Sequence, residues 1–179
     1  NAIYVYGERI LKSFIKNNDG DMKVKYQDDL LTMYDEWLEF FPKTKSGKNQ
    51  TGKILAIKAQ SMIDFKLGTP QEIYDTYDEA FNKDQKSFTS PKGLYNYFKT
   101  YFNLYKSGNS GVTLESLFNK YEDLTEKFEF EMSSYTTKLD ILLKKESNND
   151  PLSTKETRNK KVYEVNMVAC STYLKNLNA

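Results

Sequence analysis

The chain contains no histidine and a single cysteine, Cys170, in 179 residues. It therefore lacks the commonest general base and metal ligand near neutral pH. One cysteine also excludes an internal disulfide and a thiolate-based zinc site. Cys170 lies in the apolar row Val162, Val165, Ala169 and Tyr173. We interpret it as a small buried side chain rather than a reactive thiol.

Turn residues and long hydrophobic runs are also scarce. Only 8 Gly and 4 Pro occur, which argues against a β-sandwich with its many turns and favours long helices. No stretch approaches the ~20 apolar residues that a membrane-spanning helix needs. Lys and Arg total 26 against 25 Asp and Glu, a net charge of +1. The charge of the whole chain thus gives no argument for nucleic acid or an anionic membrane as a partner.

Apolar residues in helical spacing are what the chain has in quantity. Hydrophobic residues make up 39% and charged residues 28%, as in a folded soluble protein. Seven helices can be drawn, over about 2–17, 23–41 and 52–66, two more in a helical hairpin at 69–107, a long helix at 113–147 and a terminal helix at 154–176. No segment alternates long enough for a strand, and short links imply antiparallel neighbours. We predict an all-α, right-handed stack of antiparallel helical hairpins.

Local signals place several helix ends. Thr69-Pro70-Gln71-Glu72 and Ser153-Thr154-Lys155-Glu156 are typical of capping boxes, in which a hydroxyl and a carboxylate satisfy orphan amides. Pro42, the polar run 17–20 and the run 107–111 are expected to stop helices. The last helical pattern runs to the C-terminus without a stop signal, so we expect the chain to be a piece excised from a longer protein.

Three helical rows stand out. In the first segment one face holds Ile3, Tyr6, Ile10 and Phe14. In 113–147 a spacing near 3.5 residues predicts packing against an antiparallel or coiled partner, and this helix is the candidate for self-association. The run 94–105 has six aromatics, with Leu94, Phe98, Tyr101 and Tyr105 on one face.

A helix that is apolar nearly all round is either buried or presented to a partner. We interpret 94–105 chiefly as a core helix. Tyr95 and Tyr97 lie off its main row, so they are the candidates to reach an exposed face and bind a partner. Base stacking would need a basic groove beside them, so nucleic acid is not predicted.

One segment is similar to a phosphate-binding loop. Residues 47–53 match the first seven positions of GxxxxGK[ST], but Ile54 stands where a Ser or Thr must hold magnesium, and no strand precedes the loop. We interpret it as a flexible basic loop that could attract an anion weakly through its lysines, Lys43, Lys45, Lys48 and Lys53.

The acidic residues form no convincing site. A calcium loop around Gly20 fails because Ile15 and Tyr26 would take its first and last ligand positions. Asp75, Asp78 and Glu79 are interpreted as a solvated helix face. We therefore predict no catalytic residue, metal or cofactor, and no enzyme.

The N-terminal helices resemble a degenerate tetratricopeptide repeat over residues 3–42. Ile3 takes the place of the signature Trp, Tyr6-Gly7 that of Leu-Gly, and Ile10 that of Tyr. Tyr34, Trp37 and Pro42 would match the second helix. The chain departs from the pattern because Trp37 replaces an Ala and the hairpin link is about eleven residues too long.

A broader resemblance rests on three blocks, residues 6–12, Phe41-Pro42 and residues 91–98. They look like an uncharacterised group of tetratricopeptide-like (TPR-like) helical-repeat proteins from Bacteroidetes bacteria. The resemblance implies one TPR-like α-solenoid over 1–179 in an exported protein of the periplasm or envelope. It assigns no catalytic residue.

Two functions remain. The first is a non-enzymatic module of the bacterial cell envelope that binds an unknown protein or peptide, or acts as a scaffold. The alternative is a structural, self-associating helical segment with no ligand site of its own.

Overall fold

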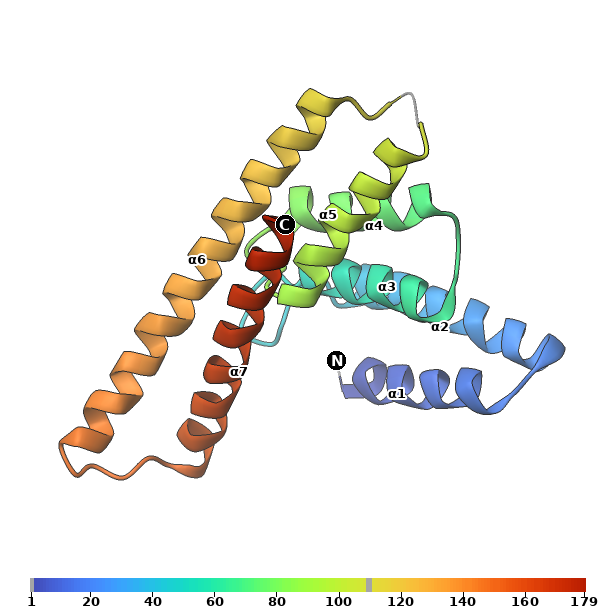
Figure 1. The fold of residues 1–179 in the computed structure, drawn as a ribbon. Helices are drawn as coiled ribbons and strands as arrows, with labels where there is room; N and C mark the ends of the chain where they lie inside the picture. The colour runs from blue at the N-terminus through green and yellow to red at the C-terminus, as the bar shows by residue number, and fades with distance from the viewer. Residues whose placement is uncertain (1, 109–110) are drawn as a thin grey trace. The chain divides into compact units, whose positions relative to one another are not determined.

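A computed structural model describes residues 2–108 and 111–179 (Figure 1). These residues form seven helices and no strand, which confirms the predicted all-α class. The helices are α1 (Ala2–Asn17), α2 (Gly20–Phe40), α3 (Thr51–Phe65), α4 (Pro70–Asp84), α5 (Pro91–Lys106), α6 (Leu114–Ser147) and α7 (Thr154–Leu177). Their bounds lie close to the predicted ones. Asn109 and Ser110, part of the predicted stop at 107–111, lie outside the described residues.

The chain divides into two compact units, Asn1–Gly93 and Leu94–Ala179. The boundary falls inside α5, so the hairpin predicted at 69–107 and the single array predicted for 1–179 both cross it. That continuous right-handed array stays a prediction. The first unit contains two helical hairpins and the second contains one.

The first unit contains two hairpins, α1 with α2 and α3 with α4, and α2 also packs on α3. Three helices contribute to one core cluster, which consists of Ile15, Leu30, Tyr34, Trp37 and Ile54. Tyr4 of α1 stacks on Trp37 with ring centroids 5.6 Å apart. The aromatic residues of the second helix are thus the centre of this core.

α1 carries apolar side chains on two sides. Tyr4, Leu11 and Ile15 face the core cluster. The row predicted from spacing is exposed: Ile3 (75%), Tyr6 (63%), Ile10 (52%) and Phe14 (43%). Of these four, Phe14 also contacts Tyr26 of α2, with ring centroids 5.0 Å apart. The positions matched to the repeat signature in α1 therefore belong largely to its outer face, and the repeat assignment stays a prediction.

A buried hydrogen-bond network joins the first three helices. The Tyr34 hydroxyl donates to Glu8 Oε1 at 2.9 Å and lies 2.8 Å from the Ser61 hydroxyl. Burial raises the pKa of the Tyr34 phenol far above its ordinary value, so the group stays a proton donor. The network satisfies a phenol that would otherwise be costly to bury.

α4 begins as its sequence predicts. Thr69 accepts from the Glu72 amide while the Glu72 carboxylate accepts from the Thr69 amide, which completes the capping box. Tyr77 of α4 stacks on Phe88, with ring centroids 5.8 Å apart. The segment between α4 and α5 is therefore held against the inner face of α4.

The second unit is dominated by the α6–α7 hairpin, seen as the long pair of helices in orange and red in Figure 1. α6 runs unbroken for 34 residues. The apolar row predicted from its 3.5-residue spacing, which we call the seam, is buried at Leu117, Leu124, Phe128, Tyr135 and Leu142. Its first member, Leu114, is 53% exposed. α7 begins with the predicted Ser153 and Glu156 capping box. α6 therefore uses its seam to pack with α7 of the same chain.

Two charged residues are buried beside this apolar seam. Lys127 and Glu131 form an ion pair of 2.6 Å, and their side chains are 4% and 5% exposed. Cys170 of α7 is fully buried, as its interpretation requires. Burial, with the negative charge of Glu131, raises the pKa of its thiol to about 11, so it is not a reactive thiolate.

Candidate functional site

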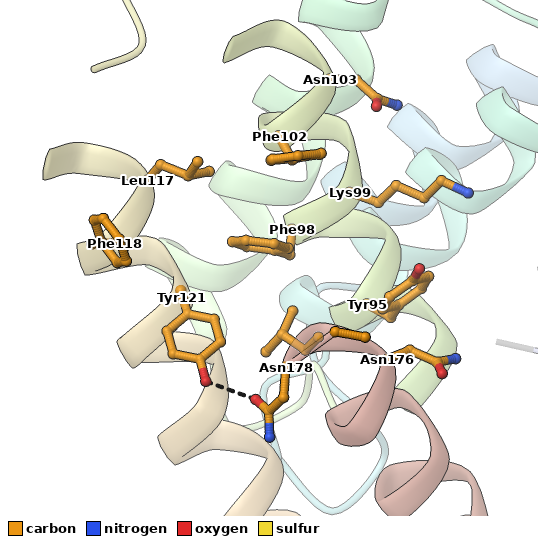
Figure 2. A pocket seen from close by; sticks show the side chains of 12 residues that line it. Tyr95, Phe98, Lys99, Phe102, Asn103, Leu117, Phe118, Tyr121, Asn176 and Asn178 are labelled. Atoms are coloured by element: carbon orange, nitrogen blue, oxygen red, sulfur yellow. Dashed lines mark hydrogen bonds between the residues drawn. The ribbon is translucent and has the colours of Figure 1, made fainter. Parts of the chain in front are cut away.

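A cavity of about 510 Å³ lies in the second unit, between α5, the start of α6 and the end of α7 (Figure 2). We call it the aromatic groove and define it by its lining: Tyr95, Phe98, Lys99, Phe102, Asn103, Leu117, Phe118, Tyr121, Asn176, Leu177, Asn178 and Ala179. Three successive helices of the second unit thus supply one largely apolar site.

α5 can line this groove because both of its sides are apolar. Its buried side carries Leu94, Tyr97, Tyr101 and Leu104. Phe98 and Phe102 lie one turn apart on another side and stack at 6.3 Å. The inner row predicted from spacing mixed these two sides, since it put Phe98 beside Leu94.

α6 supplies the opposite wall. Tyr121 meets Phe98 edge-on, with ring centroids 6.2 Å apart. The Tyr121 hydroxyl donates to Asn178 Oδ1 at 2.7 Å, the dashed contact in Figure 2. Leu117 and Phe118 lie beside it, and Phe118 is 59% exposed. The groove is therefore open to solvent at Phe118, and at Tyr121 a hydrogen bond joins α6 to the residue that follows α7.

Tyr95 is part of the groove. Its ring is half-buried and stacks on Tyr173 of α7 at 5.1 Å. The sequence candidate thus lines a cavity, although whether it binds a partner stays a prediction.

The expectation that Tyr97 reaches an exposed face is wrong, because its side chain is fully buried. Lys120 Nζ donates to the Tyr97 hydroxyl at 2.5 Å and lies 4.7 Å from the centre of its ring. Spacing placed Tyr97 off the main row, but in the fold the row that contains Tyr97 is the buried one. Tyr97 belongs to the support of the site and offers no surface to a partner.

The groove has few polar groups, and none of its twelve side chains is acidic. Lys99 and the amides of Asn103, Asn176 and Asn178 are its exposed polar side chains. A predominantly apolar cavity with a few polar groups is the usual form of a binding site for small molecules or side chains.

The loop similar to a phosphate site has its amides occupied by the chain itself. At the start of α3 the Gly52 amide donates to Asp84 Oδ2 at 3.3 Å, and the Lys53 amide donates to the Ser87 hydroxyl at 2.9 Å. The Ser87 hydroxyl in turn donates to Asp84. A carboxylate therefore already caps this helix end, where a phosphate would have to bind.

The acidic residues of α4 bond along their own helix. Asp78 accepts from Tyr74 and Asn82, and Glu79 pairs with Lys83. In the described part of the chain no group of three or more Cys, Asp or Glu side chains could hold a metal ion. These contacts agree with the interpretation of a solvated face.

No helix among the described residues is long and apolar enough to cross a membrane. Comparisons with protein-family models, with curated proteins and with solved structures find no match to this chain. The resemblance to TPR-like proteins of Bacteroidetes therefore stays a prediction.

Sequence reasoning missed most of the groove. Phe98 and Phe102 could have been recognised as a pair four residues apart in the aromatic run. Phe118 and Tyr121 carried no such signal, because only the packing of α6 brings them opposite α5. The polar end of α7 could not be connected to either helix from its sequence.

Proposed function

We propose that the chain is a non-enzymatic protein- or peptide-binding module, and that the aromatic groove holds an apolar side chain of its partner. The observation that supports this is the convergence of Phe98, Phe102, Phe118 and Tyr121 around one cavity of about 510 Å³. Rings of this kind give rigid contact area at low cost in conformational entropy. The cavity is within the usual size range of binding pockets, roughly 300–1,000 Å³.

The polar rim suggests the rest of the partner's chemistry. Lys99 is the one cation in the lining, and no acidic side chain accompanies it. A peptide with an aromatic or aliphatic anchor next to an acidic or amide side chain would match both parts of the groove. On the three sequence blocks alone, we extend the proposal to the envelope or periplasm of a Bacteroidetes bacterium.

A displayed library of random linear peptides tests this function. The folded chain should enrich peptides with a shared aromatic or aliphatic anchor. Phe118→Ala should weaken their binding by about tenfold or more, because it removes one wall of the groove. Isothermal titration calorimetry with a synthetic peptide from the enriched pool measures the change.

Phe130→Ala is the matched control. Phe130 is on the same helix, is 65% exposed against 59% for Phe118, and does not line the groove. Equal losses in both variants, or a library without enrichment, would contradict the proposal. Circular dichroism of both variants shows whether the helices are retained.

The alternative function is self-association. The sequence made α6 the candidate for it, but in the structure the outer row of α1 is the better candidate. The α6 seam packs with α7, whereas the outer row of α1 is exposed, although Phe14 at its end contacts Tyr26 of α2. An apolar row on a hairpin can pair with a second copy of itself.

A further inference from the structure

The link between α2 and α3 is an ordered turn. Residues 42–50, which we call the basic turn, contain an antiparallel bridge between Lys43 and Asn49. The Gln50 amide donates to the Pro42 carbonyl and the Thr44 amide to the Lys48 carbonyl, both at 2.9 Å. These contacts give the basic turn a defined backbone path, whereas the sequence predicted a flexible loop.

The basic turn is strongly cationic in a chain that is nearly neutral. No acidic residue occurs between Glu39 and Asp64, whereas this stretch has five lysines. Of these, Lys58 lies within α3 and pairs with Asp35 of α2. Lys43, Lys45 and Lys48 are exposed, and no ion pair with a described carboxylate involves them. This local charge is hidden by the net charge of +1.

The neighbouring helix ends add to the charge. Lys53 at the start of α3 and Lys86 after α4 are both exposed. They lie at the same end of the first unit, because the Lys53 amide donates to Ser87. The carboxylate there, Asp84, is engaged by Gly52 and Ser87.

Exposed aromatic rings lie next to these lysines. Phe40 ends α2 and is 61% exposed, and Phe41 is 42% exposed. The Gln50 side chain donates to the Phe41 carbonyl at 2.8 Å, which fixes the backbone at Phe41 to the base of the basic turn. The Phe41 ring contacts Tyr4 of α1, with ring centroids 5.6 Å apart. Residues 45–49 are all exposed, so the basic turn projects from the unit.

We infer that this end of the first unit binds an anionic lipid surface. Lysines attract the headgroups of acidic lipids, and aromatic side chains favour the interface between headgroup and acyl chain. A lipid surface can accept both the charges and the rings of a projecting turn, because an apolar layer lies beneath its anionic headgroups, whereas an acidic peptide matches the charges alone. The exposed lysines thus favour an acidic partner, and the exposed phenylalanines favour a lipid surface over an acidic peptide. This surface lies in a different unit from the aromatic groove.

Co-sedimentation with vesicles tests the inference. The full chain should partition to vesicles of phosphatidylcholine and phosphatidylglycerol much more strongly than to phosphatidylcholine alone. Added salt should weaken the binding, because it screens exposed charges beyond about 10 Å at 0.1 M. Replacing Lys43, Lys45 and Lys48 together by Gln should lower the partition coefficient roughly a hundredfold, at about fivefold per lysine.

The matched control changes the same charge elsewhere. Lys144, Lys155 and Lys161 are exposed in the second unit, and their joint replacement by Gln should leave binding nearly unchanged. Phe40→Ala tests the ring, and should weaken binding about tenfold while Phe130→Ala does not.

Equal partition to neutral and acidic vesicles would overturn the inference, as would equal losses in the two lysine triple variants. Binding to a poly-glutamate peptide without binding to acidic vesicles would also overturn it and assign the surface to an acidic protein segment. Circular dichroism of each variant separates lost binding from lost fold.

Discussion

At the scale of single residues, Gly52 shows how a motif can have a packing cause. It is the second glycine of the segment similar to a phosphate loop. A Cβ built on Gly52 would lie 2.1 Å from the Asp84 carbonyl oxygen, so only glycine lets α3 begin this close to the last turn of α4. The sequence does contain part of the phosphate-loop pattern, but helix packing explains the glycine at position 52 without any bound phosphate.

Gly52→Ala should therefore lower the free energy of unfolding by about 1–3 kcal/mol, because backbone would have to move to admit the methyl group. Gly7→Ala is the control. Its Cβ would meet only the flexible Met33 sulfur at 3.2 Å. Alanine also favours the helix by up to about 1 kcal/mol, so this variant should be neutral or stabilised. Urea denaturation measures both, and an unchanged Gly52→Ala would refute the packing explanation.

At the scale of elements, the turn between α6 and α7 is fixed by one carboxylate. Glu156 accepts from the Ser153 hydroxyl at 2.7 Å, from the Ser153 amide at 2.8 Å and from Lys145 Nζ at 3.0 Å. These contacts, the Ser153 hydroxyl above all, lower the pKa of Glu156 to about 2 from an ordinary 4.5. The capping box and a cation from the preceding helix thus act on the same group.

A carboxylate whose pKa is lowered by folding stabilises the fold at any pH above its ordinary pKa. This stabilisation is lost as the pH falls from the ordinary pKa to the lowered one. Glu156→Gln should lower the unfolding midpoint at pH 7, and its difference from the natural chain should disappear between pH 4.5 and about 2. Thermal unfolding across this range, followed by circular dichroism, checks it. Glu129→Gln removes another exposed carboxylate of this hairpin and should leave the midpoint unchanged. A difference that persists at pH 2 would contradict the assignment.

Element ends were the most predictable part of the structure. Thr69 and Ser153 carry short-range capping chemistry that acts within four residues, so the sequence alone contains the relevant partners. The faces of α1 and α5 were less predictable. Both helices have apolar residues on two sides, and spacing alone cannot say which side a neighbour covers.

At the scale of the whole molecule, the outer row of α1 is an exposed apolar surface. Its four side chains are exposed although their spacing resembles that of a core row. A row on one helix is small beside the ~800 Å² per partner of a standard interface, so any pairing through it should be weak.

Self-association therefore predicts a weight-average mass that rises only at high concentration. Ile10→Lys should remove the rise, because a charge in the middle of the row cannot be buried cheaply. Val165→Lys, an exposed valine on α7, is the control and should leave it unchanged. Sedimentation equilibrium measures the mass. A constant monomer mass at all concentrations would rule out the self-associating function.

The sequence by itself determined the all-α class, the position of each helix and the lack of histidine-based or disulfide chemistry. These properties depend on residue content and on contacts within a few residues of each other. Only the tertiary structure decided that Tyr97 is buried, that Phe118 and Tyr121 face α5, and that Ile10 faces outward. These outcomes depend on which helices pack together, and a helix with two apolar sides is compatible with either choice until its neighbours are in place.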